Sequence, residues 1–125
     1  MQVDFEQRTQ YLLARLCGRY SFAGMLRVID RIAKESARRN VKKVLIDVSI
    51  EGDTPLMDRY EYGMYAVRAL RGLEKCAAAC KVPEHHAGVT FTENLVANRG
   101  FPLRVFHQTD EAIRWLVGPA RNERP

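Results

Sequence analysis

A short polar loop and the helix after it form the part of this 125-residue sequence best suited to chemistry. Asp53 and Thr54 follow an apolar segment typical of a buried strand, and Asp58 and Arg59 come one helical turn later. Ligands of open α/β sheets bind at the carboxyl ends of strands, and free N–H groups at a helix N-terminus favour anions. These four residues are therefore candidate binding residues. The competing interpretation is a helix start capped by Thr54 and Pro55, whose acids only balance the helix dipole.

The same helix carries three tyrosines and two of the chain's methionines. Tyr60 and Met64 share the apolar face that we expect to pack in the core. Tyr62 and Tyr65 fall elsewhere on the helix, where a large side chain with a polar tip suits an apolar pocket or an interface. We therefore add Tyr62 and Tyr65 to the candidate binding residues.

The sequence offers no recognisable catalytic or metal-binding motif. It has no GxGxxG, Walker-type GxxxxGK, GxSxG, HExxH or CxxC string. His85 and His86 are adjacent, so in an extended loop their side chains point apart, and together with Cys80 they lack the four ligands of a structural zinc site. We expect exposed loop histidines there, and His107 has no nucleophile or carboxylate partner nearby in the sequence. These features predict a protein without a cofactor, a metal or an enzymatic activity.

The charge balance favours acidic partners only weakly. Twenty Lys and Arg against fifteen Asp and Glu give a net charge of +5. Part of the excess follows one edge of the first helix, at Arg27, Arg31, Lys34 and Arg38, with Asp30 and Glu35 interleaved. Such mixed charges are ordinary on solvated helices, and no nucleic-acid motif accompanies them. We expect a mixed-charge surface rather than a nucleic-acid interface.

The N-terminal residues and the cysteines indicate the compartment. Residues 1–10 lack an apolar run, so no secretory signal is expected, and no segment approaches the roughly 18 apolar residues of a transmembrane helix. The three cysteines, Cys17, Cys76 and Cys80, are an odd number and fit a reducing environment. We expect all three to be small buried apolar side chains in a cytoplasmic protein.

The hydrophobic periodicity predicts an α/β fold in the order ββαβαβαβα. Strands are expected at 3–8, 11–17, 44–48, 76–82 and 103–106, and helices at 22–39, 55–71, 90–98 or 92–98, and 110–117. We expect a single domain over residues 1–118, with a mixed sheet of four to five strands and about four helices, and a flexible tail at 119–125. The small side chains of the fourth strand would let the covering helices approach closely.

Local signals mark several element boundaries. The first two strands are expected to form a hairpin near Thr9 and Gln10. Ser21 is the expected N-cap of the first helix and Asn40 its end residue. Thr109 is the expected N-cap of the last helix.

The element order and several strings resemble the STAS fold, the sulfate transporter and anti-sigma-factor antagonist domain. They are most similar to the small bacterial proteins grouped as STAS/SEC14-like. The strings are LIDVS at 45–49, MDRYEYG at 57–63, ENLVANRG at 93–100, and LRVF at 103–106 followed by DEA at 110–112 and WL at 115–116. They extend from about Tyr11 to Leu116, nearly the whole chain. The resemblance is more specific for a fold than for a function.

The resemblance implies two kinds of site. Anti-sigma-factor antagonists carry a phosphorylatable Ser at the start of the helix after this strand, usually within Asp-Ser-Ser-Gly. This chain has Asp-Thr-Pro at 53–55 instead, which makes Thr54 the candidate phosphoacceptor but weighs against a kinase-regulated partner switch. Phosphate there would add about −1.5 to −2 of charge. The SEC14-like comparison implies an apolar or lipid-like ligand held against the sheet, beside Tyr62 and Tyr65.

Together these observations predict a non-enzymatic STAS-like binding or regulatory module that acts through protein–protein interaction. The alternative is a carrier or sensor of a small apolar or lipid-like ligand bound beside the sheet. Either function is compatible with a homodimer. An apolar cavity beside Tyr62 and Tyr65 would favour the carrier, whereas a filled core with an exposed patch would favour the protein partner.

Overall fold

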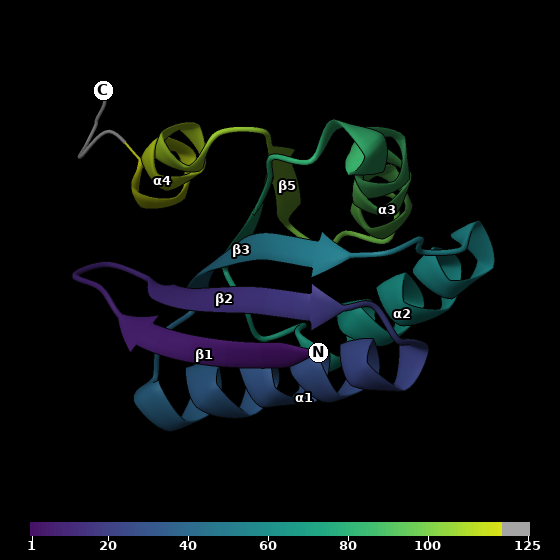
Figure 1. Cartoon of the computed structure of the whole chain (residues 1–125). Helices are drawn as coiled ribbons and strands as arrows, with labels where there is room; N and C mark the ends of the chain where they lie inside the picture. Colours follow the sequence, from purple (N-terminus) through teal and green to yellow (C-terminus); the bar gives the residue numbers. More distant parts are fainter. Residues whose placement is uncertain (119–125) are drawn as a thin grey trace.

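The computed structural model describes residues 1–118, and the predicted tail at 119–125 lies outside the described residues. The strands are β1 (Gln2–Gln7), β2 (Leu12–Arg19), β3 (Lys43–Glu51), β4 (Lys75–Cys80) and β5 (Leu103–Phe106). The helices are α1 (Phe22–Arg39), α2 (Leu56–Ala69), α3 (His86–Ala97) and α4 (Thr109–Val117), with a 3-10 turn, η1 (Pro83–His85), before α3. The predicted α/β class and element order are confirmed (Figure 1).

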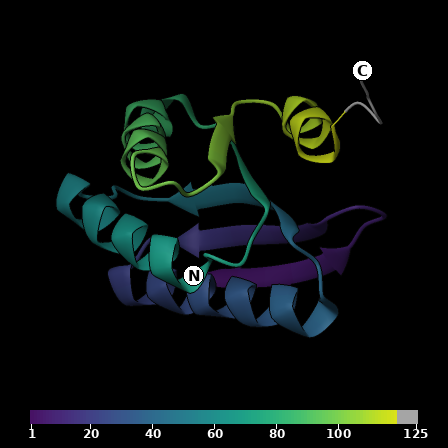
Figure 2. The same cartoon turned by 180° about the vertical axis from the view of Figure 1, so that it is seen from behind.

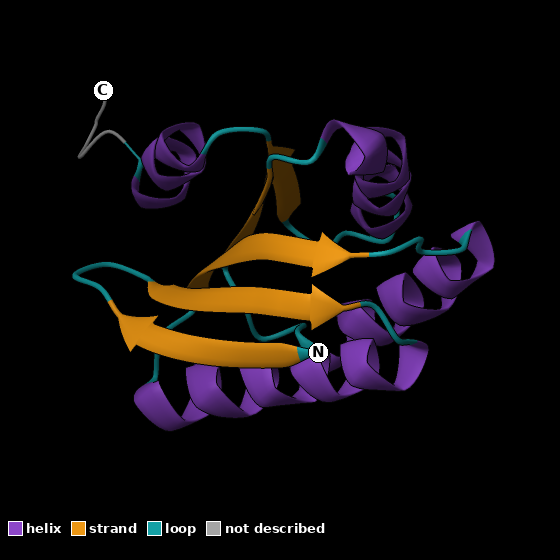
Figure 3. Cartoon of the chain, viewed as in Figure 1, coloured by secondary structure: helices purple, strands orange, loops and turns teal. Residues whose placement is uncertain are grey.

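The five strands form one mixed sheet in the order β1-β2-β3-β4-β5 (Figure 3). β1 is antiparallel to β2, and the remaining neighbours are parallel. The Arg8 N–H donates to the Tyr11 carbonyl at 2.9 Å and closes the hairpin over Thr9 and Gln10, as predicted. Because each parallel strand is added on the same side of the last, the strand order never reverses. The sheet therefore lacks the switch point at which doubly wound folds bind ligands.

The helices cover the two faces of the sheet unequally. α1, α2 and α3 pack on one face, where Leu16, Val44 and Cys76 of the strands share a core with Ile32 and Val96 of the helices. α4 alone packs on the other face. Its Ala112 and Leu116 are fully buried against Leu45, Ala77 and Ala79. Figures 1 and 2, from opposite directions, both show α3 and α4 on opposite sides of β5.

Both predicted ends of α1 are confirmed. The Ser21 hydroxyl accepts a hydrogen bond from the Gly24 N–H at 3.0 Å, which satisfies one free donor of the first turn. Asn40 ends the helix in the left-handed conformation at φ 54°. This conformation suits Asn better than most residues with a side chain, because its short polar group tolerates it.

The exposed face of α1 carries an ion-pair cluster around Glu35. Its carboxylate accepts hydrogen bonds from Arg38 at 2.9 and 3.0 Å and from Arg39 at 2.9 Å. These hydrogen bonds, Arg38 first, lower the pKa of Glu35 to about 2. Its ionised form is therefore favoured by folding.

The predicted start of α3 is wrong. The helix begins at His86 rather than at Thr90 or Thr92, because Pro83 starts a 3-10 turn that continues directly into it. Thr92 lies inside the helix, where its hydroxyl donates to the Gly88 carbonyl at 3.1 Å. This is the back-bonding expected of a mid-helix threonine, not a cap.

Two predicted helix caps are also wrong. α2 begins at Leu56 with Pro55 at its N-cap position, so Thr54 lies one residue outside the helix and does not cap it. α4 begins at Thr109 itself, with Gln108 in the extended conformation at the N-cap position. Neither helix start has a side-chain cap hydrogen bond.

The cysteines divide between the two faces of the sheet. Cys76 and Cys80 are buried, as predicted. Cys17 is exposed, which contradicts its predicted burial. It lies on the same face of β2 as Leu13, but α4 covers only the Leu13 end of that face.

No helix within residues 1–118 is long and apolar enough to cross a membrane.

Charged side chains form hydrogen bonds or ion pairs at both edge strands of the sheet, β5 and β1. β5 has only four residues, and its Val105 N–H donates to the Glu93 carboxylate of α3 at 2.8 Å. Near the β1 edge, Arg15 of β2 pairs across the strands with Asp4 at 3.2 Å and with Glu6 at 2.7 Å.

Candidate functional site

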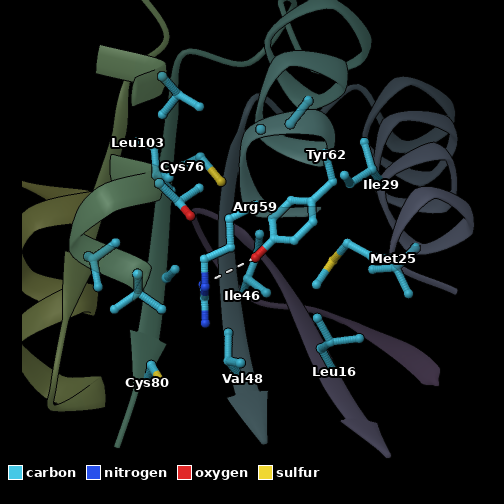
Figure 4. Close-up of a pocket in the computed structure, with 18 of the residues that line it drawn as sticks. Leu16, Met25, Ile29, Ile46, Val48, Arg59, Tyr62, Cys76, Cys80 and Leu103 are labelled. Carbon is cyan, nitrogen blue, oxygen red and sulfur yellow. Dashed lines mark hydrogen bonds between the residues drawn. The ribbon is translucent and has the colours of Figure 1, made fainter. Parts of the chain in front are cut away.

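An apolar cavity of about 130 Å³ lies between the sheet and helices α1, α2 and α3 (Figure 4). Its floor consists of alternate residues of the inner strands: Leu16, Ile46, Val48, Ile50, Cys76, Ala78 and Cys80. Its roof comes from the three helices, including Met25 and Ile29 of α1, Tyr62 of α2 and Val96 of α3. Most of these side chains offer only apolar surface to a ligand.

The exposure of the inner strands confirms that this space is not filled by side chains. Ile46 and Val48 of β3 and Ala78 of β4 are only partly buried, although helices cover this face of the sheet. On the opposite face of the same strands, Leu45 is 1% exposed and Ala77 is fully buried. The difference arises because α4 packs directly on the sheet, whereas α1, α2 and α3 leave a gap above it.

Small side chains on β4 have opposite effects on the two faces. Ala77 and Ala79 allow α4 to approach closely, as predicted. On the other face, Ala78 lies between Cys76 and Cys80, and all three line the cavity. Short side chains on that face leave volume that the helices above do not fill.

One charged group, the guanidinium of Arg59, lies in the wall of this apolar cavity. Arg59 is only 6% exposed, and its Nη1 donates to the Tyr62 hydroxyl at 3.2 Å. Within residues 1–118, no carboxylate lies within ion-pair distance of this guanidinium. Burying a cation without an opposite charge is costly, so this arrangement is unusual for a purely structural residue.

Tyr62 is the second polar group of the cavity wall. It is 8% exposed, and burial raises the pKa of its hydroxyl, with smaller opposing effects from Arg59 and Thr92. The hydroxyl therefore stays protonated at neutral pH. Its oxygen accepts from Arg59 and its proton remains able to donate to another acceptor.

Gly88, at the start of α3, lies directly against the Arg59 guanidinium. A Cβ at this position would collide with the Nε and Cζ atoms of Arg59. The absence of a side chain thus lets the N-terminal end of α3, the positive end of its dipole, approach the cation. His85 of η1 and Val89 of α3 complete this end of the cavity.

Asp58, the residue before Arg59, forms no ion pair with it among the described contacts. Its carboxylate accepts a hydrogen bond from the Tyr20 hydroxyl at 2.9 Å. Burial and then this hydrogen bond raise the pKa of Tyr20. The Tyr20 ring lies 6.4 Å from the Tyr62 ring, centroid to centroid, so the two tyrosines link the loop before α1 to the cavity wall.

The structure brings together only part of the predicted set. Thr54, Arg59 and Tyr62 line the cavity. Asp53 is exposed in the loop before α2 and does not line the cavity. Tyr65 does not line it either, because its hydroxyl turns to α1 and donates to Asp30 at 2.5 Å.

The predicted core residues of α2 are wrong. Tyr60 is 39% exposed and Met64 only partly buried, whereas Tyr62 and Gly63 are the buried residues of this part of the helix. Gly63 faces α3, where Leu95 lies close enough to touch a side chain at this position. The helix therefore turns its Tyr62 face, not its Tyr60 face, toward the sheet.

The histidines are not the exposed loop residues that we expected. His85 is half-buried in the cavity wall, and His86 begins α3 with its ring stacked on His107 at 3.6 Å between centroids. The buried His86 Nε2 has no hydrogen-bond partner among the described residues. In the same part of the chain, no group of three or more His, Cys, Asp or Glu side chains could hold a metal ion.

Most of the cavity wall was missed by the prediction. The missed residues include Met25, Ile29 and Ile32 of α1 and Thr92 and Val96 of α3. Their helical spacing indicated only an apolar face, which is the same signal that a filled core gives. The wall as a whole can bind and orient a small molecule through apolar contact, the Arg59 cation, and the polar side chains of Thr54, Tyr62, His85 and Thr92.

Comparison with known proteins identifies no family for this chain. No family model matches it, and no curated protein matches it. The resemblance to STAS and SEC14-like proteins therefore stays a prediction from the sequence. The geometry of the cavity is the basis for a functional proposal.

Proposed function

We propose that this protein is a non-enzymatic, STAS-like binding module that carries or senses a small, largely apolar ligand in the cavity beside Tyr62. The observation that carries the proposal is the unfilled space above β3 and β4, where Ile46, Val48 and Ala78 remain partly exposed under three helices. Apolar side chains that face a space left by the surrounding side chains lose packing contacts, so this space is best explained by a ligand that supplies them.

The size of the cavity sets the size of the ligand. An engineered apolar cavity of about 150 Å³ accommodates benzene. The cavity here, about 130 Å³, is of similar size, so the apolar part of its ligand corresponds to one aromatic ring or a short aliphatic chain. The acyl chain of a long-chain lipid exceeds this volume.

Benzene itself provides the test. In methyl-labelled protein, titration with benzene should shift the NMR resonances of Ile46 and Val48, which line the cavity, with saturation. The methyl groups of Leu116, packed under α4 on the opposite face, are the internal control and should not move. Unchanged Ile46 and Val48 resonances, or equal shifts at Leu116, would contradict the proposal.

A second candidate function, regulation through a protein partner, is favoured by an exposed apolar patch at the start of α2. Leu56 is 59% exposed, Met57 70% and Tyr60 39%. This patch adjoins Asp53 and the candidate phosphoacceptor Thr54. Exposed apolar clusters of this kind are typical of interaction sites.

The patch is tested by comparing Met57→Glu with the unmodified protein. In a quantitative pull-down from the source organism, Met57→Glu should lose a specific partner that an exposed control substitution, Arg71→Glu, retains. Light scattering shows whether that partner is a second copy of the chain. Thr54→Glu should change the affinity for the same partner if phosphate at Thr54 regulates it, and unchanged capture by both Met57→Glu and Thr54→Glu would rule out this function.

A further inference from the structure

We infer that the ligand of the cavity is a small monocarboxylate, with an apolar body of about one aromatic ring and a carboxylate that pairs with Arg59. This inference rests on the proposed function and names the chemical class of its ligand. It starts from the mismatch between an apolar cavity and the buried cation in its wall.

The charge of Arg59 lacks a partner within the described fold. The nearest acid along the chain, Asp58, is held by the Tyr20 hydroxyl, and no described ion pair includes Arg59. The Tyr62 hydroxyl accepts from Nη1 but carries no charge. A carboxylate bound in the cavity would remove this imbalance, since breaking or omitting one partner of a buried ion pair is strongly unfavourable.

The donors around Arg59 match a carboxylate in geometry. A guanidinium presents N–H groups in a planar fork, which suits the two oxygens of a carboxylate. Figure 4 shows the Arg59 guanidinium and the Tyr62 hydroxyl joined by their hydrogen bond in the cavity wall. The Tyr62 proton is free to donate to the same anion, and the N-terminal end of α3 at Gly88 adds a favourable dipole.

The rest of the wall restricts the anion to a single charge on an apolar body. Arg59 is the one Lys or Arg residue among the described lining residues. Apart from Arg59 and Tyr62, the only polar side chains among the described lining residues are Thr54, His85 and Thr92. A phosphate or sulfate would place further polar oxygens against the apolar remainder of the wall, such as Ile46 and Val48, which cannot hydrogen-bond to them. A carboxylate neutralises the charge of Arg59 and leaves the remaining surface of the cavity to contact an apolar group.

The test compares benzoate with its uncharged isostere benzamide, by calorimetry and by the methyl shifts of Ile46 and Val48. Because hydrogen bonds to charged groups outweigh neutral ones, benzoate should bind about 10- to 100-fold more tightly than benzamide. Arg59→Gln should abolish this preference while benzamide binding changes less than about twofold. Arg68→Gln, an exposed arginine on the same helix, is the matched control and should retain the preference. Hexanoate and hexanamide repeat the comparison with an aliphatic body, and dodecanoate tests whether a lipid-sized acid is excluded.

Each outcome separates this inference from the proposed function. If benzamide and benzoate shift Ile46 and Val48 with equal affinity, the cavity binds ligands but the carboxylate inference is wrong. If benzene and both acid–amide pairs leave these resonances unchanged, the cavity does not bind small molecules and both proposals fail. Should Arg59→Gln not fold, as judged by circular dichroism, Arg59→Lys and Tyr62→Phe take its place. Both should reduce the preference for benzoate, and an unchanged preference in both would overturn the inference.

Discussion

Filling the cavity from the strand side should stabilise the protein. Ala78 of β4 is partly exposed because its side chain faces the cavity, and Val at this position would place two further carbons there. Val is also favoured over Ala in strands. We therefore expect Ala78→Val to raise the free energy of unfolding, in contrast to most substitutions in a sheet centre.

The expected gain follows from the apolar groups that are added to the cavity. Two added carbons, at about 0.8 kcal/mol for each buried CH2 group, contribute about 1.5 kcal/mol. For a domain of this length, that gain raises Tm by about 5 °C.

The matched control is Ala79→Val, one residue along the same strand. Ala79 is fully buried against α4 on the opposite face, where its neighbours Leu45 and Ala77 are buried as well. Added carbons there should overpack the core and lower stability by about 1–3 kcal/mol. Urea unfolding and thermal melting of the two variants and the unmodified protein measure both effects.

The same pair of variants also reports on ligand binding. Ala78→Val should weaken benzene and benzoate binding, because its methyl groups occupy the space that the ligand needs. Ala79→Val, if folded, should leave binding unchanged. A Tm that falls in Ala78→Val as much as in Ala79→Val would refute the reasoning, since it would mean that side chains already fill the space above β4.

Three further predictions concern single groups. Burial raises the pKa of the Cys76 thiol to about 12. At pH 8 a thiol reagent should therefore modify the exposed Cys17 rapidly and the buried Cys76 only on unfolding. Equal modification rates at the two cysteines would contradict the burial of Cys76. Folding lowers the pKa of Glu35 to about 2 from an ordinary 4.5, so its stabilising contribution is complete above pH 4.5 and is lost as the pH falls toward 2. In acid unfolding, the free energy of unfolding of Glu35→Gln should therefore fall less between pH 4.5 and 2 than that of the unmodified protein. The same fall in both proteins would count against the ion-pair cluster. Gly88→Ala should displace the Arg59 guanidinium and weaken benzoate binding several-fold. Calorimetry with benzoate measures this effect, and an unchanged affinity would contradict the prediction.

The parts of the fold that local chemistry determines could be predicted from the sequence. Both ends of α1 follow from Ser21 and Asn40, whose side chains act on backbone groups within a few residues. The hairpin over Thr9 and Gln10 is also local. β4 could be predicted despite its three alanines because the alternation of strands and helices required a strand there.

The start of α3 could not be predicted in the same way. Thr90 and Thr92 have the side chains of a cap, and the adjacent histidines favour neither helix nor loop strongly. The observed start at His86 depends on Pro83 and on a packing contact with α2 far away in the sequence, at Gly88. A contact between distant segments leaves no periodic signal in either of them.

The candidate site was predicted in its residue types but not in its location. Arg59 and Tyr62 are three residues apart, so they lie on one face of α2 and meet in the cavity. Tyr65 follows at the same spacing, but the face turns enough for its hydroxyl to reach Asp30 of α1 instead. The cavity itself is the volume that the side chains of several strands and helices leave between them. No single segment of the sequence indicates how large that volume is.

The pairing of Val105 with Glu93 has a consequence for how this protein behaves at high concentration. An open strand edge exposes N–H and C=O groups that can recruit strands from other molecules. Here the carboxylate of Glu93 occupies an N–H group of the short edge strand β5, and charged residues flank the opposite edge at β1. Both edges thus discourage strand addition and the aggregation that follows from it. Within residues 1–118, the exposed apolar residues at the start of α2 lie outside both sheet edges, so the proposed protein contact there does not require strand addition.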